Sequence, residues 1–336
     1  MRTATIDLLK ASYGRYAVGA FNVSNLEQIH GLFRGAARAQ APIIVQFTRA
    51  IRNYAHPQML AAMVRAAEAI YPQVSFSMHL DHGDEAACAD AIVSEDYSSV
   101  MIDASHLAFE ENVAVTRRVV EQAHAQGIAV EAELGLLKGI EDGVAVDEQA
   151  AILTDPSEAE EFVSRTGCDS LAVAIGTSHG AYKFAGKQRL HLDRLREIQA
   201  RLPRFPLVLH GGSAVPLNEI ERINSAGGAI DSSAGGVSDQ ELLQAISFGI
   251  TKVNIGTDGR LIWTRVHREF FSQAPQEFDF MLPGKTYVEE YAVFVAAKCQ
   301  KLGADGAAQL ANRGRPHASP PIASVVRSEK GRSPSP

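Results

Sequence analysis

Cysteine is scarce in this sequence, with three residues among 336, at positions 88, 168 and 299. They are far apart and form no CxxC pair, so we interpret them as ordinary thiols rather than a disulfide framework. The chain also lacks any run of about 18 apolar residues, and its first residues lack the apolar stretch of a secretory signal. These absences predict a cytoplasmic protein that does not cross a membrane.

Clustered positive charge is also missing. The sequence has 32 Lys and Arg residues against 39 Asp and Glu residues, for a formal net charge of −7. Without a dense basic stripe it cannot neutralise a phosphate backbone, which excludes nucleic acid as the main partner. A small phosphorylated ligand is still compatible, because it needs only a few local donors.

Apolar residues are plentiful, at 46% of the chain, and they recur in eight short runs separated by amphipathic helical stretches. Runs without polar interruption, such as residues 43–45 and 207–209, are typical of a parallel sheet buried on both faces. Strands alternating with helices in this number predict an α/β fold, a (β/α)8 TIM barrel. The predicted strands are residues 18–21, 42–48, 74–80, 99–103, 128–134, 170–175, 206–210 and 251–257.

Several helix boundaries can be read from the sequence. Ser24 and Glu27 fit a capping box, and the apolar stripe of the helix that follows begins at Leu26. Asp155 before a proline marks another helix start, and Gly167 marks its end.

Two segments are additional to the eight strand–helix units of a minimal barrel. Residues 219–250, between strands seven and eight, predict two helices around a glycine-rich excursion. Residues 261–302 predict further helices after strand eight, with a break at Pro283 and Gly284. We therefore expect one barrel domain over residues 1–303. Residues 304–336, rich in Pro, Ser and Arg, are expected to be a disordered tail.

Histidines and a glutamate follow the predicted strands at their C-terminal ends, where barrels of this kind carry their working residues. His82 ends strand three, Glu133 closes strand five, His179 follows strand six and His210 ends strand seven. One such histidine alone is more often a hydrogen-bonded structural residue. Three imidazoles and a carboxylate on one face match the ligands of a catalytic zinc ion.

Asp81, beside His82, has two interpretations. It precedes a predicted helix and fits an N-cap, or it moves a proton next to a metal-bound carbonyl. The loops after strands six, seven and eight carry glycines, hydroxyls and Lys183, and such loops bind anions through backbone N–H groups. Together these loops indicate a phosphorylated substrate.

Eight motifs, in one order and spacing from about Ile6 to Leu302, resemble the class II fructose-bisphosphate aldolase family. The resemblance implies zinc on His82, His179 and His210, with Glu133 as an additional or alternative ligand. It implies that Asp81 is the acid/base at the C4 hydroxyl and that Glu141 is the proton shuttle of a mobile loop. The motifs are AFNVSN (20–25), HLDHGD (79–84), SVMIDAS (99–105), VEAELG (130–135), EDG (141–143), GTSHGAYK (176–183), LHGGS (209–213) and KVNIGTD (252–258).

The resemblance also implies a substrate-binding set. Asn254 matches a ligand contact, Thr48 a position that is usually serine, and Arg260 an arginine that reaches a second phosphate across a subunit interface. It further implies a monovalent cation, Na⁺ or K⁺, held partly by the Ser178 carbonyl, and a homo-oligomer, a dimer or tetramer. The residues matching binders of the first phosphate are Gly180, Lys183, Gly211, Ser213 and Thr257.

The activity implied is reversible zinc-dependent cleavage of fructose 1,6-bisphosphate to dihydroxyacetone phosphate and glyceraldehyde 3-phosphate, in glycolysis and gluconeogenesis. Gly256 departs from the pattern, because many fructose-specific members carry aspartate there, and Ala214 replaces a frequent glycine. Tagatose and sedoheptulose bisphosphates are therefore alternative substrates. A non-catalytic aldolase-like subunit and a metal-dependent isomerase or epimerase are less favoured alternatives.

Overall fold

The computed structural model describes residues 1–308 apart from 137, 142–143, 147–151, 180–188 and 232–235. Within these residues, eight parallel strands close into a barrel in the order β1-β11-β10-β8-β5-β4-β3-β2. This confirms the predicted (β/α)8 barrel, and each predicted strand overlaps an observed one. The barrel strands are β1 (Val18–Asn22), β2 (Ile43–Thr48), β3 (Phe76–Gly83), β4 (Ser99–Ile102), β5 (Ala129–Leu134), β8 (Ser170–Val173), β10 (Leu207–Leu209) and β11 (Ile250–Ile255).

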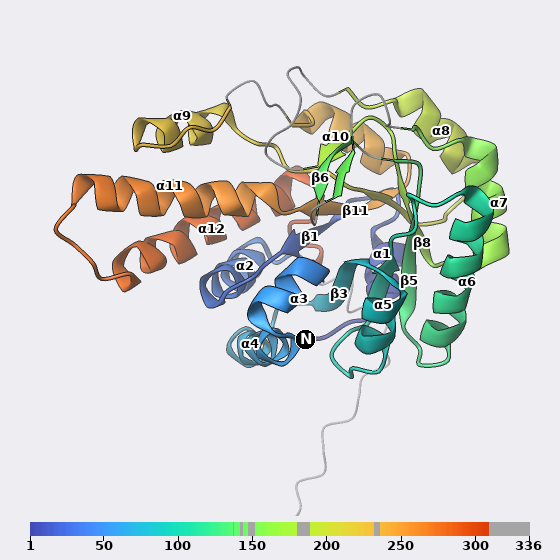
Figure 1. Cartoon of the computed structure of the whole chain (residues 1–336), viewed down its shortest axis with the longest axis horizontal. Coiled ribbons are helices and arrows are strands. Elements are labelled where there is room, and N and C mark those ends of the chain that lie inside the picture. Colours follow the sequence, from blue (N-terminus) through green and yellow to red (C-terminus); the bar gives the residue numbers. More distant parts are fainter. Residues whose placement is uncertain (137, 142–143, 147–151, 180–188, 232–235, 309–336) are drawn as a thin grey trace, which may run out of the picture.

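Helices surround the barrel and bury its outer face (Figure 1). Every residue of β2, β4, β8, β10 and β11 is buried, as a sheet covered on both sides requires. The helices are α1 (Thr5–Ser12), α2 (Leu26–Ala39), α3 (Arg49–Ala55), α4 (Pro57–Ile70), α5 (Glu85–Ile92), α6 (Phe109–His124), α7 (Pro156–Thr166), α8 (Leu192–Arg201), α9 (Leu217–Ser225), α10 (Asp239–Ser247), α11 (Thr257–Gln273) and α12 (Met281–Lys301).

The capping box of α2 lies one residue later than predicted. Asn25 is the N-cap, and its side chain accepts from the Gln28 N–H at 2.9 Å, while Gln28 Oε1 accepts from the Ser24 N–H at 2.7 Å. The shift leaves the side chain of Leu26 61% exposed, so its predicted place in the apolar stripe was wrong. The prediction for α7 is confirmed, with Asp155 as N-cap and Gly167 ending the helix at φ 71°.

The predicted additional helices are also present. α9 and α10 lie between β10 and β11, and α11 and α12 follow β11 as a helical hairpin that extends away from the barrel (Figure 1). The predicted break at Pro283 and Gly284 was wrong, because both lie in the first turn of α12. A first-turn proline costs little, since its missing N–H would have no acceptor within the helix. The chain breaks instead between α11 and α12.

The last helix packs on the first helix of the barrel repeat. α12 crosses α2 at two glycines, Gly31 and Gly35. A methyl group at Gly35 would lie 2.5 Å from the carbonyl oxygen of Ala292, so any larger residue would push the helices apart. β1 pairs with β11 beneath them, so both ends of the barrel sequence meet on one side.

The described chain remains packed on the barrel past residue 303, where we expected the domain to end. Ala304 and Ala307, just past residue 303, still belong to the main hydrophobic core. Residues 309–336, most of the predicted tail, lie outside the described residues.

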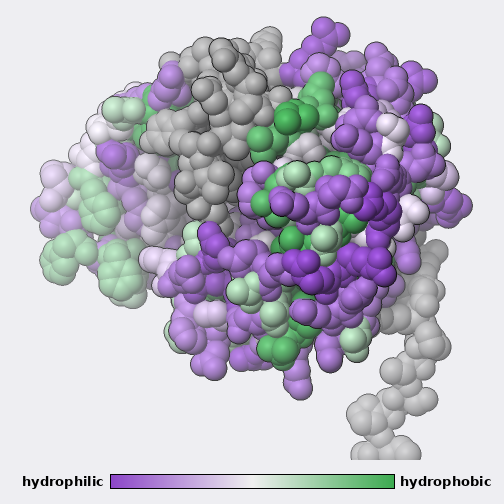
Figure 2. All heavy atoms as spheres, turned by 45° about the vertical axis from the view of Figure 1, so that its right-hand side comes forward, coloured by the Kyte–Doolittle hydropathy of each residue, from purple (hydrophilic) through white to green (hydrophobic). Residues whose placement is uncertain are grey.

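In the view of Figure 2, the hydrophobic areas of the described residues lie among hydrophilic ones. Among the helices that the structure describes, none combines the length and apolar character of a membrane span.

Candidate active site and metal centre

The C-terminal ends of β3, β5 and β10 bring together His82, Glu133 and His210, as the sequence predicted. The rings of His82 and His210 meet edge to face with centroids 4.8 Å apart. Glu133 Oε2 lies 3.4 Å from His210 Nδ1 and 4.0 Å from His82 Nδ1. His82 has a φ of 48°, a left-handed conformation that non-glycine residues adopt mainly where the surrounding structure enforces it.

This donor set suits a divalent cation. Ligand atoms of Asp81, His82 and His210 lie within 4.8 Å of one another, and so do those of His82, Asp103 and Glu133. Imidazole nitrogens and carboxylate oxygens are the ligands that zinc accepts. A cation among them would also neutralise the carboxylates buried here, which are costly to bury unpaired.

Asp103 orients the ring of His82 and was missed as a functional residue. His82 Nδ1 lies 2.7 Å from Asp103 Oδ2, and Asp103 Oδ1 accepts from the Ser105 hydroxyl at 2.8 Å. Burial raises the pKa of Asp103, but these hydrogen bonds from His82 and Ser105 outweigh it and hold that pKa below its usual value. With Nδ1 bound to Asp103, Nε2 is the nitrogen of His82 suited to a metal. The only sequence signal was an aspartate directly after strand four.

His210 is held between two carboxylates. Its Nε2 lies 3.0 Å from Glu131 Oε1, and its Nδ1 faces Glu133. Burial lowers the pKa of His210, but Glu133 and Glu131 outweigh burial and raise it to about 9. A cation bound at Nδ1 would take the place of a proton on that nitrogen.

Asp81 is fully buried and accepts hydrogen bonds from three side-chain amides. Asn22 donates to its Oδ2 at 2.8 Å and Gln46 at 3.2 Å, while Asn254 donates to its Oδ1 at 3.0 Å. The helix-cap interpretation was wrong, because the N-cap of α5 is Asp84. The three amides fix the orientation of the Asp81 carboxylate.

Two of these amides were missed from the sequence. Asn22 and Gln46 are polar residues in otherwise apolar strands, and that was the available signal. Whether their amides reach Asp81 depends on how the strands are aligned. In the observed register of β2 and β3, Thr48 stands opposite Asp81. The third amide, Asn254, was predicted to contact a ligand; the structure shows that it also donates to Asp81, and the ligand contact stays a prediction.

The loop after β10 is tied to the start of α11. Ser213 Oγ accepts from the N–H groups of Gly256 and Thr257, both at 3.2 Å. Gly211, at φ 66°, turns the chain into this loop. The loop therefore lies at a helix N-terminus, where backbone N–H groups favour an anion.

Side chains from α11 and α12 hold the same loop from behind. The Asp258 carboxylate accepts from the N–H groups of Ala214 and Val215 at 3.0 and 2.9 Å. Buried Lys298 donates to the Gly212 carbonyl at 3.0 Å. A methyl group at Gly236 would lie 2.4 Å from the Ser213 carbonyl oxygen, so Gly236 also packs closely against the loop.

The remaining predicted residues lie in different surroundings. Thr48 is buried and caps α3 by accepting from the Ile51 N–H at 3.3 Å. Arg260 is exposed in the first turn of α11. Gly180 and Lys183 lie outside the described residues.

Glu141 and His179 are described by their backbones only, and these lie in one small sheet. β6 (Lys138–Glu141) pairs with β7 (Val144–Val146) and with β9 (Ser178–His179), in the order β7-β6-β9. Gly139 stands opposite His179 in the register. The sheet follows β5 and β8, so it places both segments at the C-terminal end of the barrel.

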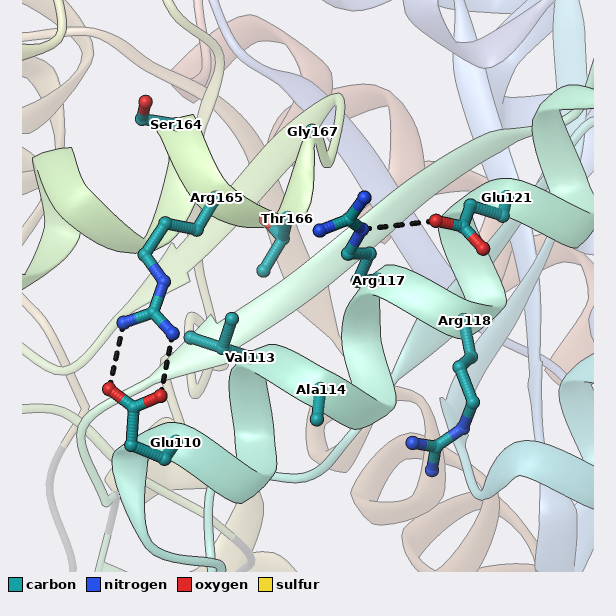
Figure 3. Close-up of a pocket in the computed structure, with 10 residues that line it drawn as sticks. All are labelled: Glu110, Val113, Ala114, Arg117, Arg118, Glu121, Ser164, Arg165, Thr166 and Gly167. Atoms are coloured by element: carbon teal, nitrogen blue, oxygen red, sulfur yellow. Dashed lines mark hydrogen bonds and ion pairs between the residues drawn. The ribbon is translucent and has the colours of Figure 1, made fainter.

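A groove of about 800 Å³ lies elsewhere, between α6 and α7 on the outside of the barrel (Figure 3). Its arginines are engaged by glutamates: Arg165 with Glu110 through two contacts of 2.8 and 2.6 Å, and Arg117 with Glu121 at 3.0 Å. The groove contains none of the residues at the strand ends.

Comparison with known proteins agrees with this fold. The family model for class II fructose-bisphosphate aldolase matches residues 3–307. A fructose-bisphosphate aldolase from Thermus caldophilus is 43% identical over 304 residues, covering 90% of this chain and 97% of the relative. One from Giardia intestinalis is 41% identical, covering 83% and 86%.

Solved structures show the same relationship. The YdjI aldolase from Escherichia coli K12 superimposes with a TM-score of 0.71 at 28% identity, covering 92% of this chain and all of that one. The chain defines a barrel enzyme of the aldolase type, a lyase. It belongs to the class II fructose-bisphosphate aldolase family.

Proposed function

We propose that the protein cleaves and forms fructose 1,6-bisphosphate in a zinc-dependent reaction, yielding dihydroxyacetone phosphate and glyceraldehyde 3-phosphate. The main support is the position of Asp81, held by three amides beside His82 and His210. A carboxylate fixed next to a metal-binding pair is the arrangement that proton removal from a bound hydroxyl requires.

The chain's own residues divide the chemistry. His82, His179 and His210 would hold zinc, with Glu133 as a further or alternative ligand. A bound ion would supply positive charge to offset the negative charge that develops as the bond breaks. Asp81 takes the proton of the C4 hydroxyl as the C3–C4 bond breaks, which releases the aldehyde. Glu141 then delivers a proton to carbon. With a cation as the electrophile, no Schiff-base lysine is needed.

The loop after β10, held at the start of α11, would bind the C1 phosphate, which leaves with dihydroxyacetone phosphate. The backbone of Gly211 and the hydroxyls of Ser213 and Thr257 supply donors, joined by Gly180 and Lys183. Their binding energy positions the reacting carbons. We further propose a monovalent cation, Na⁺ or K⁺, held in part by the carbonyl of Ser178.

The far end of the substrate would lie toward Gly256 and Arg260. A Cβ atom at Gly256 would lie 3.1 Å from Asn22 Oδ1, so an aspartate there would crowd the amide that orients Asp81. Its absence leaves room that tagatose or sedoheptulose bisphosphate could use. We propose a homo-oligomer, a dimer or tetramer. In it, Arg260 reaches across the subunit interface to the second phosphate of the substrate bound to a neighbouring subunit.

We also propose a cytoplasmic location and a role in glycolysis and gluconeogenesis. Cys88, Cys168 and Cys299 are all buried free thiols, which suits a reducing compartment.

A coupled assay for triose phosphates tests the proposal. Fructose, tagatose and sedoheptulose bisphosphates are supplied in parallel, and we expect the highest kcat/KM for fructose 1,6-bisphosphate. Isomerised sugar without triose phosphate would indicate an isomerase or epimerase. No conversion of any of the three by zinc-loaded protein would indicate a non-catalytic subunit.

Asp103→Asn should weaken zinc binding by about 10- to 100-fold, the usual effect of losing a group that orients a ligating histidine. An amide in place of the carboxylate keeps the shape but loses the charge that fixes the His82 ring. Competition with a chromogenic chelator measures the zinc Kd. Asp84→Asn, at the cap of α5, is the matched control and should leave the Kd unchanged. Equal zinc Kd values for Asp103→Asn and wild type would show that Asp103 does not contribute to zinc binding.

A further inference from the structure

A buried group of charged residues beneath the site has no part in the proposed reaction. Lys252 of β11 and His79 of β3 are completely buried, and Glu131 of β5 is 2% exposed. Lys252 Nζ lies 2.8 and 3.1 Å from the two carboxylate oxygens of Glu131 and 3.3 Å from His79 Nε2. Three different strands therefore contribute to one network inside the barrel.

The donors and acceptors of this network fix the state of His79. An ammonium group only donates hydrogen bonds, so His79 Nε2 must accept from Lys252. The proton of the ring is then on Nδ1, which donates to Ser99 Oγ at 2.7 Å. Ser99 in turn is 2.7 Å from Thr5 Oγ1, so the chain of contacts ends in hydroxyls at the bottom of the barrel. Burial, followed by the charge of Lys252, lowers the pKa of His79 to about 3, which agrees with a neutral ring.

The same reasoning applies on the other side of Glu131. An ionised carboxylate only accepts, so the 3.0 Å contact between Glu131 Oε1 and His210 Nε2 places a proton on Nε2. Nδ1 is then the nitrogen that faces Glu133 and the other ligand candidates. The charge of Lys252 keeps Glu131 in the accepting form.

We propose that Lys252 and Glu131 act as a positioning pair that determines which ring nitrogen of His210 binds the metal ion. The inference rests on the proposed metal site. It explains why a lysine and a glutamate are present where apolar residues would suffice. Burying such a pair is costly, and replacing one with apolar residues is often neutral or stabilising.

Three variants test the pair: Lys252→Met, Glu131→Gln and the double variant. Each single change leaves one buried charge without its partner and should destabilise the fold. The double variant removes both charges, so we expect its melting temperature to recover relative to the single variants. Its zinc Kd, measured by chelator competition, should nevertheless stay about 10- to 100-fold above wild type. A double variant with both stability and zinc affinity restored would overturn the proposal and leave a purely structural pair.

A direct readout is the nitrogen-15 spectrum of zinc-loaded protein labelled at histidine. We expect His210 to carry its proton on Nε2 and to bind zinc through Nδ1, and the double variant to lose this preference. Zinc bound through Nε2 in the wild type would contradict the proposal. Neither measurement needs turnover, so a failure to cleave sugars would not be confused with a failure of positioning.

A buried ion pair elsewhere provides the matched control. Arg265 of α11 is 3% exposed at its side chain and lies 2.6 Å from Glu219. Arg265→Met should destabilise the fold, as Lys252→Met does, without changing the zinc Kd. A change of zinc Kd in Arg265→Met as large as that in Lys252→Met would show that general loosening, not positioning, weakens the site.

Discussion

Asp81→Ala is expected to lower kcat/KM for ketose bisphosphate cleavage by about 10²- to 10⁴-fold, the contribution that a positioned acid/base usually makes. The variant should still bind zinc, because His82, His210 and Glu133 are untouched. The large loss of activity is expected because the amides of Asn22, Gln46 and Asn254 hold the Asp81 carboxylate in a single orientation. Steady-state kinetics and metal analysis of the same sample measure both effects.

Asp81→Asn is the matched control for shape. An asparagine fills the same space but cannot take a proton, so we expect a similar loss of activity. It also separates chemistry from stability, because alanine leaves buried amides without an acceptor, at a cost of about 1–3 kcal/mol each. Loss of zinc together with activity in both variants would show that Asp81 is a metal ligand rather than the base. Its ligand oxygen is close enough to His82 and His210 for that alternative.

Removal of the metal with a chelator should abolish cleavage, and zinc should restore it. The negative charge that develops as the carbon–carbon bond breaks needs a cation to stabilise it. Among the described residues at the strand ends, no lysine ammonium lies at the surface of the proposed metal site to replace the metal ion. Lys252 is buried beneath the cluster and engaged by Glu131. Magnesium should restore little activity, because imidazole ligands favour zinc while magnesium prefers oxygen.

Borohydride added with substrate tests for the alternative mechanism, in which a lysine forms an imine with the substrate. A metal-dependent reaction forms no imine, so we expect neither inactivation nor a reduced adduct by mass spectrometry. A substrate fragment trapped on a lysine would overturn the metal mechanism. Full activity after complete removal of the metal would do so as well.

Much of the fold follows from local sequence patterns. The eight strands were predictable because a barrel strand buried on both faces is mostly apolar, and helix ends carry capping residues. The errors concern single residues. The α2 cap moved from Ser24 to Asn25, and Pro283 was tolerated within a first helical turn. Such details depend on which backbone N–H groups lack acceptors, and spacing alone does not specify that.

The site was predictable where its residues end strands, as His82, Glu133 and His210 do. The missed residues are Asn22, Gln46, Asp103 and Lys252. Their roles arise from lateral neighbours in the barrel, since each acts on a side chain from another strand. Which strands are adjacent, and in which register, is set by closure of the whole sheet. No local pattern contains that information.

Closure of the barrel also has a consequence for synthesis on the ribosome. β1 is made early, but its partner β11 begins only at Ile250, and the helix that covers Gly31 and Gly35 of α2 ends at Lys301. Until then the nascent chain exposes an unpaired strand edge and an uncovered helix face, both of which favour aggregation. A chain stopped before α12 would keep them exposed permanently, so the emerging polypeptide needs protection until nearly all of the barrel has been translated.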